Sequence, residues 1–108
     1  MNKNQKYFEY VVGRLDKRTI LEQLAEESSE VTKEALKVIR AEKFSNNYTP
    51  ITKEESINKL IEEINDLRMI INLLKSKYEE LDNTLPEDND TINNPKWERW
   101  AKRLGYVE

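Results

Sequence analysis

Two long segments with the apolar periodicity of helices constrain the fold of this chain more than any other feature. From residue 17 to about 43, apolar side chains recur at steps of three and four, and the pattern returns from about residue 52 to 81. This spacing places the side chains on one face of an α-helix. The polar, turn-forming stretch 45–50 separates the two segments. We therefore expect two long helices that form an antiparallel hairpin.

Shorter helices are expected at both ends of the chain. Residues 2–14 and roughly 96–104 each carry apolar or aromatic side chains at helical spacing. Residues 82–95 are acidic, rich in Asn and interrupted by Pro, which predicts a linker or mobile loop. The sequence thus predicts a single all-α domain over residues 1–108, an antiparallel helical bundle of about four helices.

Helix-capping residues stand at three of the expected boundaries. Asp16 precedes the first long helix as an N-cap, and Thr52 precedes the second, with Glu55 completing a capping box. Gly105 follows the last helix at the position that favours a left-handed backbone.

Composition excludes several kinds of function. The chain has 108 residues with 36% charged side chains and only 2 Gly, which disfavours Gly-rich nucleotide-binding folds and β-sandwiches. The net charge of −3 disfavours nucleic-acid binding. Because Cys and His are absent, disulfides, thiolate zinc sites, cysteine nucleophiles and histidine bases are excluded, and a di-iron bundle is disfavoured.

The pattern of hydropathy predicts a protein of the cytoplasm. No stretch is long and apolar enough to span a membrane, and the first ten residues lack the apolar run of a signal peptide. The abundance of Asn, Lys and Ile suggests an AT-rich bacterium or its phage, so we expect a bacterial or infected-host cytoplasm, with no membrane partner.

Two acid pairs occupy matching places in the two long segments. Glu27 and Glu30 lie three residues apart in the first, as do Glu63 and Asp66 in the second. Residues three apart share one side of a helix, so an antiparallel hairpin can bring all four carboxylates together. Four partly buried carboxylates need a compensating cation, and an all-oxygen set suits Mg²⁺. A magnesium site in a helical bundle suggests phosphate chemistry.

The projected positions of these acids favour a site over a solvated surface. At about 100° per residue, Glu27 borders the apolar arc of its helix, Glu30 lies further round, and Glu63 falls inside the arc of the next helix. The alternative is a solvated or salt-bridged face, since Glu is a common residue of exposed helices.

The motifs resemble one family. Glu26-Glu27-x-x-Glu30 followed by Glu63-x-x-Asp66, and the ending KWERWAKRL at 96–104, resemble the small phage and Firmicute members of the MazG-like, all-α nucleoside triphosphate pyrophosphohydrolases. These are relatives of dimeric dUTPases and of phosphoribosyl-ATP pyrophosphohydrolase. Two features depart from the family pattern: the long separation of the motifs by residues 31–62, and Asn65 in place of a small residue.

The resemblance implies an activity and a ligand set. It implies hydrolysis of a nucleoside triphosphate between the α and β phosphates, with release of a nucleoside monophosphate and pyrophosphate. Its metal ligands fall on Glu27, Glu30, Glu63 and Asp66, with Mg²⁺ as the cofactor and Mn²⁺ as a possible substitute. Since the chain has no His or Cys nucleophile, water is the attacking group, and Glu27 or Glu30 is the candidate for orienting it.

Five basic residues are candidates for binding the phosphates of the substrate. Lys33 and Lys37 lie near Glu30 on their helix, and Lys96, Arg99 and Arg103 lie on the last helix, which can fold over the site. The alternative for the two lysines is ordinary ion pairing along the helix. The alternative for the last three is an exposed helix end whose positive charge complements the helix dipole.

Aromatic residues near both ends are expected to be core or interface anchors rather than stacking platforms for a base. These are Tyr7, Phe8, Trp97 and Trp100.

Arg68 projects onto the apolar arc of its helix and therefore needs an acidic partner. A subunit interface is one place where such a partner could be found. The resemblance likewise implies a homodimer or homotetramer.

A non-catalytic helical interaction or regulatory module is the rival interpretation. A degenerate family member or a phage adaptor would have the same hairpin with its acids merely solvated. That alternative gives no reason for Glu27 and Glu63 to border the core.

Overall fold

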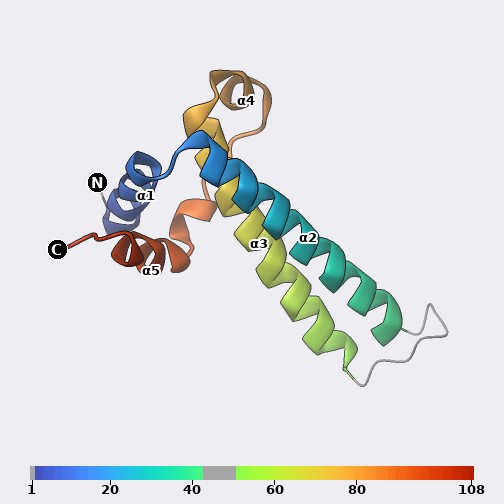
Figure 1. Ribbon diagram of the computed structural model, residues 1–108. Coiled ribbons are helices and arrows are strands. Elements are labelled where there is room, and N and C mark those ends of the chain that lie inside the picture. Colours follow the sequence, from blue (N-terminus) through green and yellow to red (C-terminus); the bar gives the residue numbers. More distant parts are fainter. Residues whose placement is uncertain (1, 43–50) are drawn as a thin grey trace.

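The computed structural model, described for residues 2–42 and 51–108, is entirely helical in that part of the chain (Figure 1). Five α-helices and one 3₁₀ turn follow one another: α1 (Lys3–Arg14), α2 (Lys17–Ala41), α3 (Lys53–Lys77), α4 (Glu79–Thr84), η1 (Thr91–Asn93) and α5 (Lys96–Arg103). The predicted all-α class, with two long helices and short terminal ones, is confirmed. The expected turn over 45–50, and the expected helix end at 43, lie outside the described residues.

Helices α2 and α3 run antiparallel side by side and form the longest part of the molecule (Figure 1). Both begin at the residues predicted to cap them. The Asp16 carboxylate accepts a hydrogen bond from the Thr19 N–H at 2.8 Å, and the Thr52 hydroxyl accepts one from the Glu55 N–H at 3.0 Å. Gly105 has φ 108°, so the last helix ends in the left-handed conformation that Gly adopts without strain.

The hydrophobic core lies at one end of the hairpin, where α1 and α5 pack together over the C-terminal half of α3 (Figure 1). Trp97 and Tyr7 are almost completely buried there, and the Trp97 indole N–H donates to the Thr91 carbonyl at 2.9 Å. The rings of Phe8 and Trp97 meet edge to face, 4.9 Å apart. These aromatic residues are therefore core anchors, as expected.

The segment predicted as a linker contains more structure than its composition indicates. Tyr78 has an extended backbone that ends α3, and α4 and η1 follow it. Between these two elements, Asp88 accepts two hydrogen bonds from the Arg68 guanidinium, at 2.8 and 2.6 Å. It also accepts a 2.7 Å bond from the Thr91 hydroxyl. The hydrogen bond from Arg68 is the largest of the effects that hold the pKa of Asp88 well below its usual range.

This contact corrects one prediction. The acidic partner of Arg68 comes from its own chain, not from a neighbouring subunit, so Arg68 gives no support for an oligomer. No helix in the described part of the chain has both the length and the apolar character needed to cross a membrane.

Candidate metal centre

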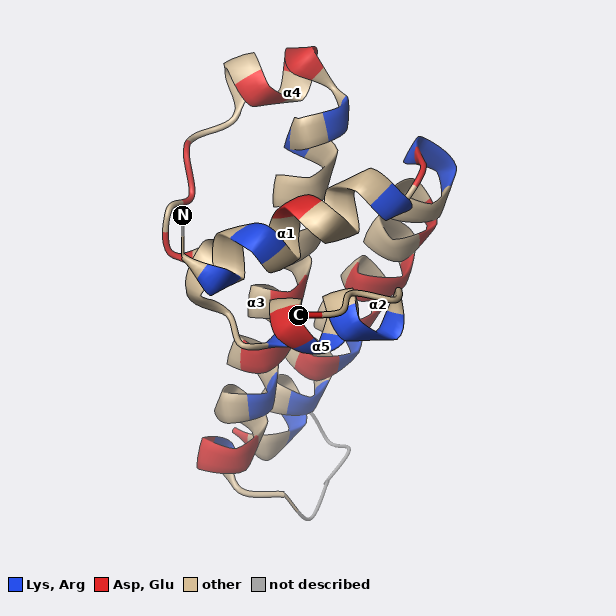
Figure 2. Ribbon diagram, turned by 90° about the vertical axis from the view of Figure 1, so that its left-hand side faces the viewer, with Lys and Arg blue, Asp and Glu red and all other residues tan. Residues whose placement is uncertain are grey.

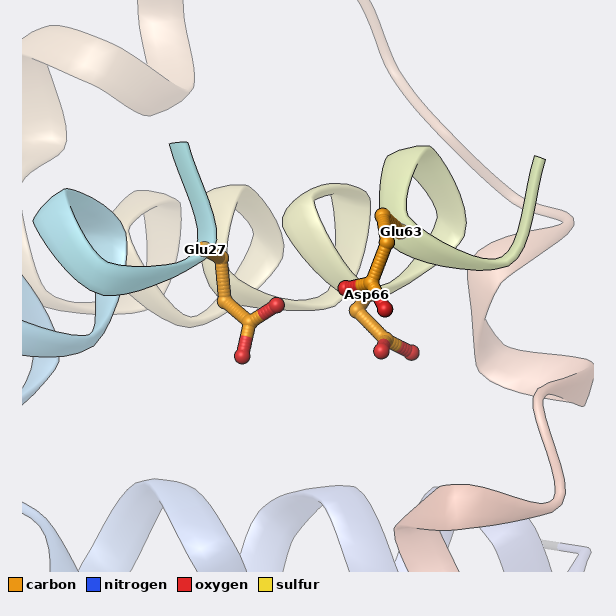
Figure 3. Close-up of side chains that lie close together, drawn as sticks. All are labelled: Glu27, Glu63 and Asp66. Carbon is orange, nitrogen blue, oxygen red and sulfur yellow. The ribbon is translucent and has the colours of Figure 1, made fainter. Parts of the chain in front are cut away.

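Three of the four acids singled out in the sequence converge between the two long helices. Glu27 projects from α2, and Glu63 and Asp66 project from α3 one turn apart (Figure 3). One carboxylate oxygen from each lies within 4.8 Å of the others. The convergence follows from the i, i+3 spacing on α3 together with the antiparallel course of α2.

The carboxylates of this cluster are partly shielded from water. Glu63 is 9% exposed, and one buried oxygen of Glu27, Oε2, has no hydrogen-bond partner. Burial raises the pKa of both Glu27 and Glu63, and the negative charge of Asp66 raises each further. A buried acceptor without a donor is costly, so the Glu27 oxygen is suited to a ligand that supplies positive charge.

Two lysines partly neutralise the cluster. The Lys96 ammonium on α5 lies 2.7 and 2.9 Å from the two oxygens of Asp66 and 3.3 Å from Glu62. Burial lowers the pKa of Lys96, but these carboxylates outweigh that effect and the pKa is raised. Lys59 lies 3.7 Å from Glu63. Neither ammonium contacts Glu27, so the positive charge is concentrated on the α3 side of the cluster.

Glu30 stands apart from the three converging acids. Its carboxylate pairs with Lys33 at 3.3 Å, and its side chain is 37% exposed. Its negative charge nevertheless contributes to raising the pKa of Glu63, although less than burial and the charge of Asp66 do. Lys37 pairs with Glu34 at 3.2 Å instead of reaching the cluster. Both lysines therefore make the ion pairs along α2 that were the alternative to phosphate binding.

A cavity of about 160 Å³ adjoins the cluster and is bordered by opposite charges. Glu27 and Asp66 line it from the hairpin, and Lys96, Arg99 and Arg103 line it from α5. The three basic residues predicted on the last helix are thus brought to the acids, whereas Lys33 and Lys37 are not among the lining residues. Figure 2 shows α5 crossing the hairpin where acidic segments of both long helices gather.

Two residues of this region, Lys59 and Gln23, were not predicted from the sequence to belong to it. Lys59 stands four residues before Glu63, a spacing that alone predicts an ion pair on one helix face. Gln23 lines the cavity one turn before Glu27, and its polar amide on the acid side of α2 was the available signal. The Trp100 ring stacks on the Trp97 ring, with their centroids 5.9 Å apart, and Trp100 also lines the cavity. Its side chain is therefore both packed against the core and part of the cavity wall.

The donor set fits a hard divalent cation. Three carboxylates from two helices offer only oxygen, the ligand atom that Mg²⁺ and Mn²⁺ prefer, and none of the soft ligands that select zinc or copper. Comparisons with protein families, curated proteins and solved structures give no match to this chain. The interpretation of the site therefore rests on its own geometry and chemistry.

Proposed function

We propose that this chain is a magnesium-dependent nucleoside triphosphate pyrophosphohydrolase of the MazG-like kind, which releases a nucleoside monophosphate and pyrophosphate. One observation carries the proposal: three carboxylates suited to a divalent cation converge between the long helices, and two of them, Glu27 and Asp66, border the same cavity as three basic side chains. A polyphosphate needs both kinds of group, because the carboxylates would hold a cation that neutralises part of its charge, and the basic side chains would hold the remaining charge.

Glu27, Glu63 and Asp66 are the residues that would hold the cation. Bound Mg²⁺ supplies charge neutralisation on the phosphates and lowers the pKa of a coordinated water. Mn²⁺ shares the preference for oxygen and is the expected substitute. Glu30 lies one turn from Glu27 and pairs with Lys33, which favours a place at the edge of the site over direct ligation.

Glu27 is the better candidate for orienting the attacking water. Its Oε2 atom has no hydrogen-bond donor, and its pKa is raised by burial, so it can accept a proton near neutral pH more readily than an ordinary carboxylate. Glu30, by contrast, is engaged with Lys33 and more exposed.

The basic side chains of α5 are placed to hold the phosphates. Lys96 lies against Asp66 and lines the cavity, so its ammonium can exchange the carboxylate for a phosphate oxygen when the substrate enters. Arg99 and Arg103 line the same wall one turn apart and can bind phosphate in the bidentate manner of guanidinium groups. A nucleoside triphosphate substrate would place the protein in the cytoplasm.

The proposal is tested by incubating the purified protein with a panel of ribo- and deoxyribonucleoside triphosphates and Mg²⁺, and measuring monophosphate and pyrophosphate release. Glu63→Gln should abolish turnover, whereas the matched change Glu54→Gln, at an exposed residue in the first turn of the same helix, should retain it. Absence of turnover across the panel with a folded protein, or full activity in Glu63→Gln, would favour the non-catalytic interaction module.

A further inference from the structure

A second and larger cavity adjoins the acid cluster. Its volume is about 500 Å³, against about 160 Å³ for the cavity between the hairpin and α5. Asp66 and Lys96 line both cavities, so the two spaces meet at the ion pair that these residues form. Sites for small molecules commonly have volumes of roughly 300–1,000 Å³. The smaller cavity is therefore too small to enclose a whole nucleotide, whereas the larger one has room for its nucleoside part.

The walls of the larger cavity come from two parts of the chain. One is α3, and the other is the segment from η1 to the start of α5, which returns beside α3 in Figure 1. Ile61 adds apolar surface to the first wall and Pro95 to the second. Side-chain amides are the most frequent groups in these walls, and they come from Asn58, Asn65, Asn93 and Asn94. We call this space the amide cavity.

The charges of the amide cavity disfavour a phosphate group. Three carboxylates line it: Glu62, Asp66 and Asp90. Both of its cations are already engaged, since Lys96 lies against two of these carboxylates and the Arg68 guanidinium is held by Asp88. The smaller cavity, by contrast, has Arg99 and Arg103 in addition to Lys96. Phosphates therefore suit the smaller cavity, and an uncharged part of the substrate suits the amide cavity.

Two of the amides have a fixed orientation. The Asn65 oxygen accepts a hydrogen bond from the Arg68 guanidinium at 3.0 Å, and the Asn94 oxygen accepts one from the Lys96 N–H at 2.9 Å. A carboxamide has one oxygen and one NH₂ group, so each residue keeps its NH₂ group as the remaining donor. Within residues 2–42 and 51–108, neither NH₂ group donates a hydrogen bond to the protein. Both are thus left to donate to a ligand in the cavity.

We infer that the amide cavity holds the base of the substrate and prefers bases that carry a ring carbonyl. Uracil, thymine, guanine and hypoxanthine have a carbonyl oxygen where cytosine and adenine have an amino group. The NH₂ group of Asn65 or Asn94 donates to such a carbonyl, whereas an amino group would meet it donor to donor. Two of the three carboxylates are occupied by Lys96, and the third, Asp90, is exposed, so they compensate little.

This preference rests on the proposed function and goes beyond the family resemblance. Asn65, one of the two donors, is a departure from the family pattern, which has a small residue at that position. The preference therefore belongs to this chain's own residues.

Matched pairs of substrates test the inference. UTP differs from CTP, and ITP from ATP, in a carbonyl group that replaces an amino group and in the proton on the adjacent ring nitrogen. With Mg²⁺ present, kcat/KM of the wild-type protein should be about tenfold or more higher for UTP than for CTP, and for ITP than for ATP. Equal values within either pair would overturn the inference, including the case in which the amides hold the sugar.

Two isosteric variants keep the structural hydrogen bonds and remove the donors. Asn94→Asp still offers an oxygen to the Lys96 N–H but has an acceptor in place of the NH₂ group. Asn65→Asp does the same opposite Arg68. Each should lower the UTP-to-CTP ratio of kcat/KM by about fivefold or more. Because both nucleotides need the same cation, a change in metal binding alone leaves this ratio unaltered.

The matched control is Asn83→Asp, at an exposed residue of α4 outside the amide cavity, and it should keep the wild-type ratio. Folded Asn94→Asp and Asn65→Asp proteins that both keep the wild-type ratio would overturn the inference.

Binding without turnover separates this inference from the proposed function. Isothermal titration calorimetry with UMP, CMP, IMP and AMP measures the preference whether or not the triphosphates are hydrolysed. Tighter binding of UMP than CMP and of IMP than AMP, with no triphosphate hydrolysed, would support the amide cavity and refute the proposed activity. Hydrolysis with no preference in either binding or turnover would do the reverse. A folded protein that binds none of the four monophosphates and hydrolyses no triphosphate would refute both.

Discussion

Replacing Glu27 with Gln should make the metal-free protein more stable and the magnesium-loaded protein less stable than the wild type. The neutral amide removes one negative charge from the cluster at nearly constant volume. Oxygens of the three carboxylates lie within 4.8 Å of one another. At that separation each charged pair repels by about 3.5 kcal/mol at an effective dielectric constant of about 20.

Lys96, which contacts Asp66, cancels part of this repulsion, but the charges of Asp66 and then Glu63 still raise the pKa of Glu27. Side-chain movement and partial protonation reduce it further, which leaves a net gain of about 1–2 kcal/mol for Glu27→Gln. For a domain of this size the gain corresponds to a Tm higher by roughly 5–10 °C. Magnesium at about 100 times its Kd should add about 2.7 kcal/mol to the wild type and much less to the variant.

Thermal unfolding followed by circular dichroism, with and without Mg²⁺, measures both effects. Glu26→Gln is the matched control, since it removes the same charge from an exposed neighbour and should change either Tm little. The raised pKa of Glu27 makes its ionised form the costly one. The advantage of Glu27→Gln should therefore shrink as the pH falls through the raised pKa of Glu27, and it should be absent below the ordinary value of 4.5. A Glu27→Gln protein that behaves like Glu26→Gln in both conditions would refute the reasoning.

Three further predictions follow from individual contacts. Lys96→Met removes the ammonium that competes for Asp66 and should tighten Mn²⁺ binding about tenfold, measured by titration. Asp88→Asn should lower the free energy of unfolding, measured by urea denaturation, by about 1–2 kcal/mol. Because the pKa of Asp88 is lowered in the folded protein, the stability that its carboxylate contributes is present above pH 3.8 and is lost in more acidic solution. The hydrogen bond to Glu108 raises the pKa of Tyr7 to about 12, so an alkaline absorbance titration should show one late tyrosine that shifts earlier in Glu108→Gln.

Local signals in the sequence predicted the helices well. The caps at Asp16 and Thr52 and the Gly105 terminus depend on residues within a few positions, so their physics can be read directly from the chain. The burial of Glu63 could also be predicted, because it follows from the angular position of one residue on one helix. These features need no knowledge of the tertiary structure.

Features that depend on contacts distant in the sequence were not predictable in the same way. Asp88 holds Arg68 across twenty residues, and Lys96 reaches Asp66 across thirty. Neither spacing corresponds to a helix repeat, so no periodic pattern indicates the contact. The separation of Glu30 from the other acids has a local cause instead, because the i, i+3 pair with Lys33, which was the alternative for that lysine, competes with the cluster.

The central claim is that Glu27, Glu63 and Asp66 together bind a divalent cation. A Mn²⁺ titration monitored by electron paramagnetic resonance tests it most directly, because only free Mn²⁺ gives the sharp signal. The wild type should bind Mn²⁺ saturably and release it to Mg²⁺. Glu63→Gln should lose that binding, and Glu54→Gln, at an exposed residue in the first turn of α3, should keep it. Equal Mn²⁺ binding by the wild type and Glu63→Gln, or none by the folded wild type, would contradict the claim.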